Sequence, residues 1–168
     1  MDDRGHLIEN IDTDQIFHNA HLHITALEEM GEYTLGNLEG WKDFPHKSNP
    51  GDILIVGRNF GAGSSRQQAV DCFLSLRIGA ILAPSFGAIY FRNAVNSGFP
   101  VLRSPEIAQL VEEGKLETGD DVRMFFISGN AQIINKNVSF HILPMSGVQH
   151  EIYRAEGLYK YAKTWNQD

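Results

Sequence analysis

The chain has 168 residues, 42% of them hydrophobic and 21% charged, which is the composition of an ordinary soluble globular protein. This length suits one domain with its own core, so we expect residues 1–168 to fold as a single unit. The formal net charge of −7 argues against a nucleic-acid partner, and the absence of an apolar run of about 18 residues argues against a membrane partner.

The amino-terminal part gives few regular signals. Met1-Asp2-Asp3-Arg4 is acidic and lacks the apolar core of a signal peptide, and the single cysteine, Cys72, excludes an internal disulfide. Both features favour a cytoplasmic protein. Residues 17–50 show little periodicity apart from a short helical pattern at 25–30, so we expect this segment to serve as a mobile lid or an interface.

Apolar runs alternate with helical patterns in the middle of the chain. Strands are predicted at 53–56, 78–83 and 100–102, with helices at 64–76 and 85–96 between them. We expect Ser64 to cap the first of these helices, with Gln67 at the capping-box position, and Ser85 to begin the second. This alternation is typical of parallel βαβ units.

The carboxy-terminal third changes to a β-rich pattern. A helix is predicted at 104–114, with Ser104 as its cap and a proline in its first turn. Residues 122–127 and 132–143 then form a predicted hairpin around a Ser-Gly-Asn turn, and residues 148–165 form a predicted docked helix. The sequence therefore predicts an α/β fold with a β-rich carboxy-terminal part.

The loop at 58–66, Arg-Asn-Phe-Gly-Ala-Gly-Ser-Ser-Arg, carries the clearest functional signal. It joins a predicted strand to a predicted helix, where active residues of parallel sheets usually lie and where a helix start presents unpaired N–H groups. Its glycines permit close backbone approach, and Arg66 can pair bidentately with a carboxylate, so the loop is suited to bind an anion. An ordinary serine-capped helix after a glycine turn is an equally good explanation of the same spacing.

Other polar residues have structural explanations beside functional ones. Ser64 or Ser65 as a nucleophile needs a histidine base, and none of the seven histidines has an informative spacing. A serine alkoxide held near arginines can act as a base without a histidine, because positive surroundings favour its charged form.

Asp12 and Asp14 can bind a metal or form Asx turns. Arg92 fits a solvated helix face equally well.

Six segments in the same order resemble the swivelling domain of the aconitase superfamily. They are Asn-Ile-Asp-Thr-Asp-Gln-Ile at 10–16, Gly-Asp at 51–52, Gly-Arg-Asn-Phe-Gly at 57–61 with Gly-Ser-Ser-Arg at 63–66, Ser-Phe at 85–86, Arg-Asn-Ala at 92–94 and Gly-Phe-Pro-Val-Leu at 98–102. The chain resembles in particular the compact small subunits of 3-isopropylmalate dehydratase and homoaconitase. The resemblance implies a β/β/α swivelling domain.

The resemblance also implies a reaction and a partner. The family dehydrates and rehydrates hydroxy dicarboxylic acids with a [4Fe–4S] cluster on a large subunit, which agrees with the single cysteine of this chain, because a cluster needs three or four. The family pattern implies Ser64 as the base that removes the proton alpha to a carboxylate. It implies that Ser65 and Arg66 bind that carboxylate, that Asp14 and Arg92 bind the substrate at the rim of the site, and that this chain holds no metal.

Substrate choice in the family depends on a loop that corresponds to residues 20–25, where Leu22, His23 and Ile24 stand. Apolar residues there suit an isopropyl group, whereas an arginine suits the extra carboxylate of a homocitrate-type substrate. This loop has no arginine, so the resemblance favours a branched malate such as 3-isopropylmalate, a substrate of leucine biosynthesis. The alternatives are a homoaconitase, a citramalate or dimethylmalate dehydratase, or a non-catalytic anion-binding module.

Four positions depart from the family pattern, and one of them, Ala62 in place of a frequent cysteine, is tolerant of change. Gln67 and Gln68 stand where relatives usually have glutamate followed by histidine or glutamine, and Ala88 stands where many have arginine. Gln67 lacks the charge that would hold Arg66, so the sequence leaves the anchor of this arginine open. These departures give the non-catalytic alternative some room.

Overall fold

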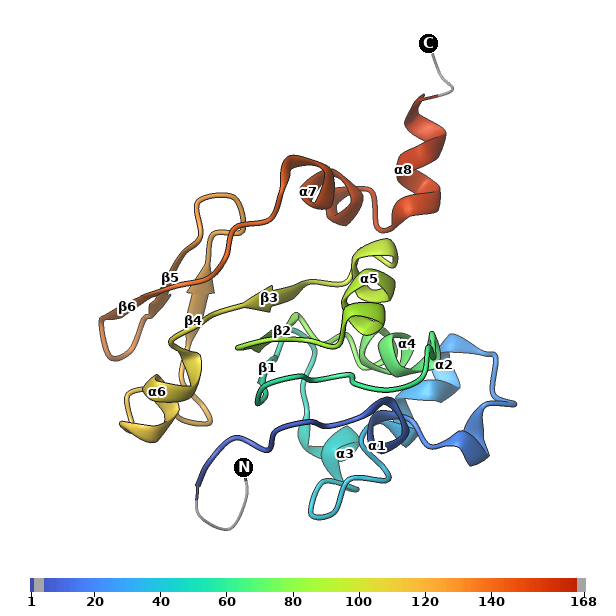
Figure 1. The fold of residues 1–168 in the computed structure, drawn as a ribbon, viewed down its shortest axis with the longest axis horizontal. Helices are drawn as coiled ribbons and strands as arrows, with labels where there is room; N and C mark the ends of the chain where they lie inside the picture. Colours follow the sequence, from blue (N-terminus) through green and yellow to red (C-terminus); the bar gives the residue numbers. More distant parts are fainter. Residues whose placement is uncertain (2–4, 166–168) are drawn as a thin grey trace.

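Three layers make up the fold in the computed structural model: an antiparallel sheet, a parallel sheet and a layer of helices (Figure 1). The structure describes Met1 and residues 5–165, so the acidic residues 2–4 considered above lie outside the described part. This arrangement is the β/β/α architecture expected from the sequence. That residues 1–168 form one domain stays a prediction.

The parallel sheet is the middle layer. Its strands are β1 (Ile53–Ile55), β2 (Ala80–Ala83) and β3 (Val101–Arg103), in that order, with α4 (Gln68–Ser75) and α5 (Ala88–Asn96) as crossovers. All four residues of β2 are buried and alternate between the two cores, since Ile81 and Ala83 join the core under the helices while Ala80 and Leu82 join the other. The predicted strands and βαβ topology are confirmed.

The antiparallel sheet covers the opposite face of the parallel sheet, together with α6 (Ile107–Glu112). It consists of β4 (Val122–Met124), β5 (Asn130–Ile133) and β6 (Val138–His141) in sequential order. The predicted hairpin is confirmed. A second turn at 134–137, with Asn137 at a φ of 54°, divides the second predicted run into two strands.

Residues 17–50 belong to the core under the helices. Their regular elements are short: α2 (Leu27–Met30), which confirms the predicted helical pattern, η1 (Asn19–His21), η2 (Gly31–Tyr33) and α3 (Phe44–Lys47). The buried hydrophobic side chains that this segment supplies are those of Phe17, Ile24, Met30, Leu35, Leu38 and Phe44. A segment that fills the core in this way is not the mobile lid that its irregular pattern predicted.

Three predicted helix starts are wrong, and they share one cause. The helices α4, α5 and α6 begin at Gln68, Ala88 and Ile107, three or more residues after the serines expected to begin them. Each serine is bonded to a distant segment instead. The Ser64 carbonyl accepts from the Thr13 hydroxyl at 3.0 Å, the Ser85 hydroxyl accepts from the Asn59 N–H at 2.9 Å, and the Ser104 hydroxyl donates to the His141 carbonyl at 2.7 Å.

The carboxy-terminal segment forms two helices, α7 (Gly147–Arg154) and α8 (Leu158–Thr164), instead of one docked helix. The chain breaks between them where Glu156 and Gly157 have φ values of 57° and 121°. Ile152 of α7 is buried, so α7 is docked as predicted, whereas α8 has no buried residue and the predicted docking is wrong for this part of the segment. Figure 1 shows α8 projecting from the body. No helix within the described residues is long and apolar enough to span a membrane.

Candidate active site

The glycine loop follows the carboxyl end of β1 and lies beside the short helix α1 (Thr13–Ile16). Backbone hydrogen bonds join the two segments, from Gly61 N–H to the Ile11 carbonyl at 2.8 Å and from Thr13 N–H to the Ala62 carbonyl at 2.9 Å. The Thr13 hydroxyl completes the contact at the Ser64 carbonyl. The segments 10–16 and 57–66, far apart in the sequence, therefore form one loop cluster.

The glycines of this cluster are required by packing. Gly61 has a φ of 75°, and a Cβ there would lie 2.2 Å from Cγ of Tyr90. A Cβ on Gly87, the residue before α5, would lie 2.5 Å from the Gly61 carbonyl oxygen. The buried Tyr90 ring thus packs against the loop, and a side chain at position 61 or 87 would displace the loop from its place.

The loop presents a run of unsatisfied donors. Among the described residues, the backbone N–H groups of residues 63–68 donate to no protein acceptor. The side chains of Ser64 and Ser65 are exposed at the same place. Consecutive free N–H groups with adjacent hydroxyls are suited to bind an anion, although the serines precede α4 and do not cap it.

Arg66 is fixed by Asp14 and not by its sequence neighbours. One guanidinium nitrogen, Nη1, lies 2.5 Å from Asp14 Oδ1 and 3.1 Å from the Phe17 carbonyl oxygen, and the arginine side chain is 15% exposed. The guanidinium hydrogen bond lowers the pKa of the Asp14 carboxyl below its usual value of 3.8, against partial burial, and the Asn19 N–H adds to the effect. Within residues 5–165, Nε and Nη2 of Arg66 have no acceptor, so this edge of the guanidinium is left with two donors for a carboxylate.

Asn93 joins the site from α5 and was missed as a site residue by sequence reasoning. Its side-chain Nδ2 donates to the Ser65 hydroxyl oxygen at 3.3 Å. The only signal in the sequence was its place in the Arg-Asn-Ala triplet at 92–94, where the arginine was the predicted site residue. Arg92 itself is exposed and contacts no described residue through a hydrogen bond or ion pair.

The two glutamines after Arg66 connect the site to its surroundings. Gln67 Nε2 donates to Asp71 Oδ1 at 2.7 Å and to the Ser97 hydroxyl at 2.8 Å, which joins α4 to the end of α5. Gln68 Nε2 donates to the Leu22 carbonyl at 3.5 Å. Since Asp14 anchors the arginine, the missing charge at position 67 does not loosen it.

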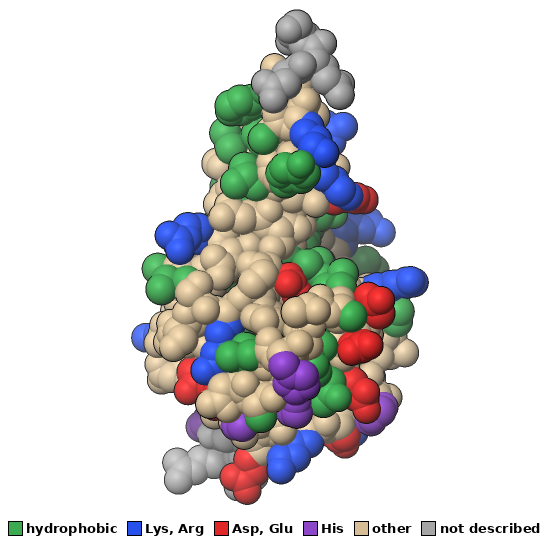
Figure 2. Space-filling model, turned by 90° about the vertical axis from the view of Figure 1, so that its right-hand side faces the viewer, with side chains coloured by type: hydrophobic (Ala, Val, Ile, Leu, Met, Phe, Trp, Pro, Cys, Tyr) green, Lys and Arg blue, Asp and Glu red, His purple; other side chains and the backbone are tan. Residues whose placement is uncertain are grey.

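The predicted specificity loop lies next to the start of α4, and its three residues differ in accessibility. Leu22 is 38% exposed, His23 is also exposed, and Ile24 is 7% exposed within the core. Of these three, Leu22 and His23 are therefore the side chains that a ligand can reach. Figure 2 shows that histidines and acidic side chains gather on the lower part of one face of the molecule, below a projecting upper part with hydrophobic side chains.

The two aspartates of the 10–16 segment have separate contacts. Asp12 caps α1 by accepting from the Gln15 N–H at 2.8 Å, whereas Asp14 pairs with Arg66. Among the described residues, no group of three or more histidine, cysteine, aspartate or glutamate side chains could hold a metal ion. Burial raises the pKa of the Cys72 thiol to about 12, which makes it a poor metal ligand.

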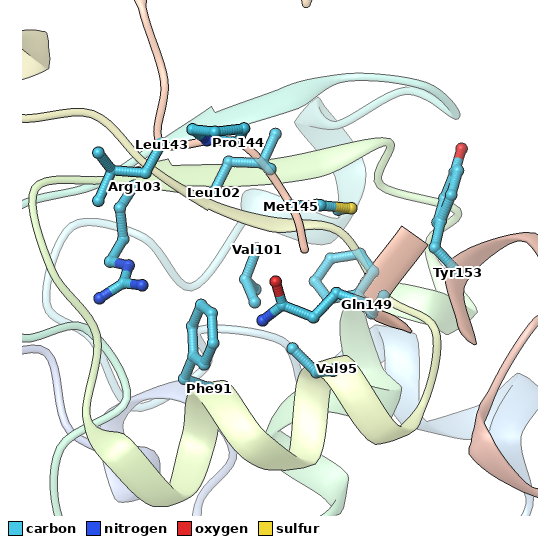
Figure 3. A pocket seen from close by; sticks show the side chains of 11 residues that line it. Phe91, Val95, Val101, Leu102, Arg103, Leu143, Pro144, Met145, Gln149 and Tyr153 are labelled. Atoms are coloured by element: carbon cyan, nitrogen blue, oxygen red, sulfur yellow. The ribbon is translucent and has the colours of Figure 1, made fainter. Parts of the chain in front are cut away.

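A separate groove lies between α5, β3 and α7 (Figure 3). Phe91 and Val95 of α5 lie across from Gln149 of α7, and the Arg103 guanidinium lies over the Phe91 ring at 5.1 Å from its centroid. None of the predicted site residues lines this groove. We therefore place the candidate active site in the loop cluster and not in the groove.

Comparisons with known proteins agree with this geometry. The profile of the aconitase C-terminal domain family matches residues 6–106. The 3-isopropylmalate dehydratase small subunit of Caldanaerobacter subterraneus is 36% identical over 92% of this chain and 92% of its own length. That of Thermodesulfovibrio yellowstonii is 34% identical over 92% of this chain and 88% of its own length.

A solved structure gives the same result at the level of the fold. The crystal structure of 3-isopropylmalate dehydratase from Methanocaldococcus jannaschii superposes with a TM-score of 0.82, at 31% identity, over 94% of this chain and 89% of that one. The chain therefore belongs to the aconitase C-terminal domain family, as a relative of the small subunits of 3-isopropylmalate dehydratase.

Proposed function

We propose that this chain is the small subunit of a two-subunit hydro-lyase that dehydrates and rehydrates a branched hydroxy dicarboxylic acid, 3-isopropylmalate first among them. The observation that carries the proposal is the guanidinium of Arg66, which Asp14 holds through Nη1 beside two exposed serines and which keeps Nε and Nη2 without a protein acceptor. Relatives of the same length and family carry the name of that enzyme's small subunit. A cytoplasmic location fits the single unpaired cysteine.

The residues of the loop cluster suit the steps of such a reaction. Nε and Nη2 of Arg66 would bind a substrate carboxylate bidentately, with Ser65 and the free N–H groups of the loop as further donors. Ser64 would take the proton alpha to that carboxylate. The same donors would then stabilise the negative charge that develops on the carboxylate as the proton leaves.

The metal chemistry of this family would come from the partner. A [4Fe–4S] cluster needs three or four thiolates, whereas this chain has one cysteine, buried and with a raised pKa. We therefore propose that a large subunit holds the cluster, which would act as a Lewis acid on the substrate hydroxyl when bound. This chain would supply the base and the carboxylate ligands.

The substrate preference is proposed from the loop at 20–25. Leu22 offers an exposed apolar side chain close to α4, and no arginine in the loop can pair with a third carboxylate. This arrangement favours 3-isopropylmalate over homocitrate-type substrates. Citramalate and dimethylmalate are smaller members of the favoured class.

Reconstitution with the large subunit encoded by the same genome tests the proposal. Ser64→Ala should lower kcat for 3-isopropylmalate by about 10²- to 10⁴-fold, the usual contribution of a general base, while the subunits still co-purify. Ser139→Ala, an exposed serine on β6, is the matched control and should keep full activity.

Each part of the proposal can be contradicted by a specific experimental result. Full activity of Ser64→Ala rejects this serine as the base. Faster turnover of homocitrate than of 3-isopropylmalate rejects the apolar substrate preference. A chain that binds no large subunit and catalyses no dehydration is a non-catalytic anion-binding module.

A further inference from the structure

We propose that Asn93 sets the direction of the Ser65 hydroxyl hydrogen bond, so that Ser65 donates its proton to the substrate carboxylate. Asn93 is thus a positioning residue that acts through Ser65. The inference rests on the proposed function, because it assigns Ser65 a carboxylate to bind. It concerns a residue outside the set that the sequence indicated.

The helix α5 supports the glycine loop at two points, three residues apart. The Tyr90 ring lies directly under Gly61, and Asn93 reaches Ser65 with its amide. Residues three apart lie on the same side of a helix, so a single rigid face carries both contacts. Ala94, next to Asn93, is fully buried, which fixes the helix at this position.

Hydrogen-bond chemistry then limits what Ser65 can do. A serine hydroxyl has one proton to donate and two lone pairs that accept, whereas the amide nitrogen of asparagine can only donate. Because Asn93 Nδ2 occupies a lone pair of Ser65, the hydroxyl proton stays available for another acceptor. A substrate carboxylate only accepts, so this is the one orientation in which Ser65 can bind it.

The charges around Ser65 favour the same direction of the hydrogen bond. The sequence neighbours of Ser65 are the neutral Ser64 and Arg66, whose guanidinium Asp14 already holds. A neutral donor at position 93 brings no negative charge toward the bound anion. An acceptor there would take the Ser65 proton for itself, and an anionic acceptor would also repel the carboxylate.

Steady-state kinetics of the reconstituted enzyme test the proposal. Asn93→Ala should raise KM for 3-isopropylmalate by about fivefold, the usual effect of one lost hydrogen bond, with kcat nearly unchanged. The isosteric variant Asn93→Asp should raise KM by about a further tenfold, because it reverses the hydrogen bond and adds a charge. Asn96→Ala, an exposed asparagine on the same helix, is the matched control and should leave KM unchanged.

A double-mutant cycle separates positioning from a general structural role. In a Ser65→Ala background, Asn93→Ala should have no further effect on KM, because the residue through which it acts is missing. Additive effects of the two substitutions overturn the proposal, as does equal KM for Asn93→Asp and Asn93→Ala. If Asn93→Ala does not assemble with the large subunit, the KM of the isosteric variant Asn93→Asp tests the proposal instead, and a KM equal to that of the wild type overturns it. Absence of dehydratase activity in the wild-type pair overturns the proposed function itself. An active wild-type pair with additive effects of the two substitutions overturns only the role of Asn93, so the two failures can be distinguished.

Discussion

A single carboxylate determines which edge of Arg66 can meet a ligand. Arginine has five N–H donors in a planar fork, and the contacts of Nη1 with Asp14 and the Phe17 carbonyl occupy one side of it. Asn37 donates to the other oxygen of Asp14 at 3.2 Å, and His18 Nε2 lies 3.9 Å from it. Asp14 is therefore better described as the anchor of Arg66 than as a direct ligand of an anionic substrate.

Removing the charge of this anchor should weaken substrate binding. We expect Asp14→Asn to raise KM about tenfold, because the guanidinium loses its strongest partner and its fixed orientation. Steady-state kinetics of the reconstituted enzyme provide the measurement. Asp43→Asn, which removes the exposed pair with Lys47 away from the site, should leave KM unchanged, and an equal effect of the two variants would contradict this role.

The Asp14 carboxylate should also make the unfolding free energy of the chain depend on pH under acidic conditions. Because the pKa of Asp14 is lowered in the folded state, its stabilising effect is present above its unfolded pKa, near 3.8, and is lost as pH falls through the folded value. The difference in unfolding free energy between wild type and Asp14→Asn should therefore shrink below about pH 3.8. Urea unfolding at pH 7, 5 and 3 measures it, and a difference that grows in acid would contradict the assignment.

At the scale of elements, the site is a junction where α1, α5 and the loop after β1 meet with no spare volume. The Tyr90 ring fills the space beneath Gly61 with 2% of the residue exposed. Its hydroxyl is buried and has no hydrogen-bond partner among the described residues, so Tyr90 contributes by the packing of its ring. The position of the loop, and with it Ser64 and Ser65, depends on this contact.

A methyl group at position 61 should break that junction. We expect Gly61→Ala to destabilise the chain by about 3 kcal/mol, since the methyl group would overlap Tyr90 and the φ is left-handed. Gly40→Ala has a similar φ of 79° with nothing within 4 Å, so it isolates the backbone effect and should cost only about 1 kcal/mol. Denaturant unfolding gives both values, and equal costs would show that the contact with Tyr90 is unimportant.

Elements fixed by local patterns could be predicted from the sequence, and elements fixed by long-range bonds could not. The strands near 53, 80 and 101 are short apolar runs that any sheet would bury, and the predictions matched them. Ser64, Ser85 and Ser104 have the local signature of helix caps, but their bonding partners lie in other segments. The loop itself could be identified from its glycines. The contact of Asn93 with Ser65 could not, because no spacing rule relates the two residues.

At the scale of the whole molecule, the three layers form the body, α7 packs against α5, and α8 extends from the body. The parallel sheet is buried on both faces, and its carboxyl edge carries the loop cluster. The projecting helix α8 instead has exposed side chains, with Tyr159 75% exposed. The stability of the body should therefore depend on α7 but not on α8.

Truncation tests this division. Deleting the residues after Gly157 should shift Tm by no more than about 2 °C, because no buried side chain is lost. Ile152→Ala in α7 is the comparison and should cost about 2 to 4 kcal/mol, since this side chain is 5% exposed. Thermal unfolding of both variants provides the measurement, and a large loss of Tm on truncation would show that α8 packs against the body in solution.

The close fit of Gly61, Gly87 and Tyr90 also determines which positions of the candidate site can be substituted in protein engineering and which cannot. No substitution at 61 or 87 can reshape the glycine loop without displacing it. A library aimed at a new hydroxy acid should instead randomise Leu22 and His23, whose side chains are exposed next to the start of α4. If the proposed function holds, diversity introduced there should change the side group that is accepted and leave the proposed carboxylate-binding residues in place.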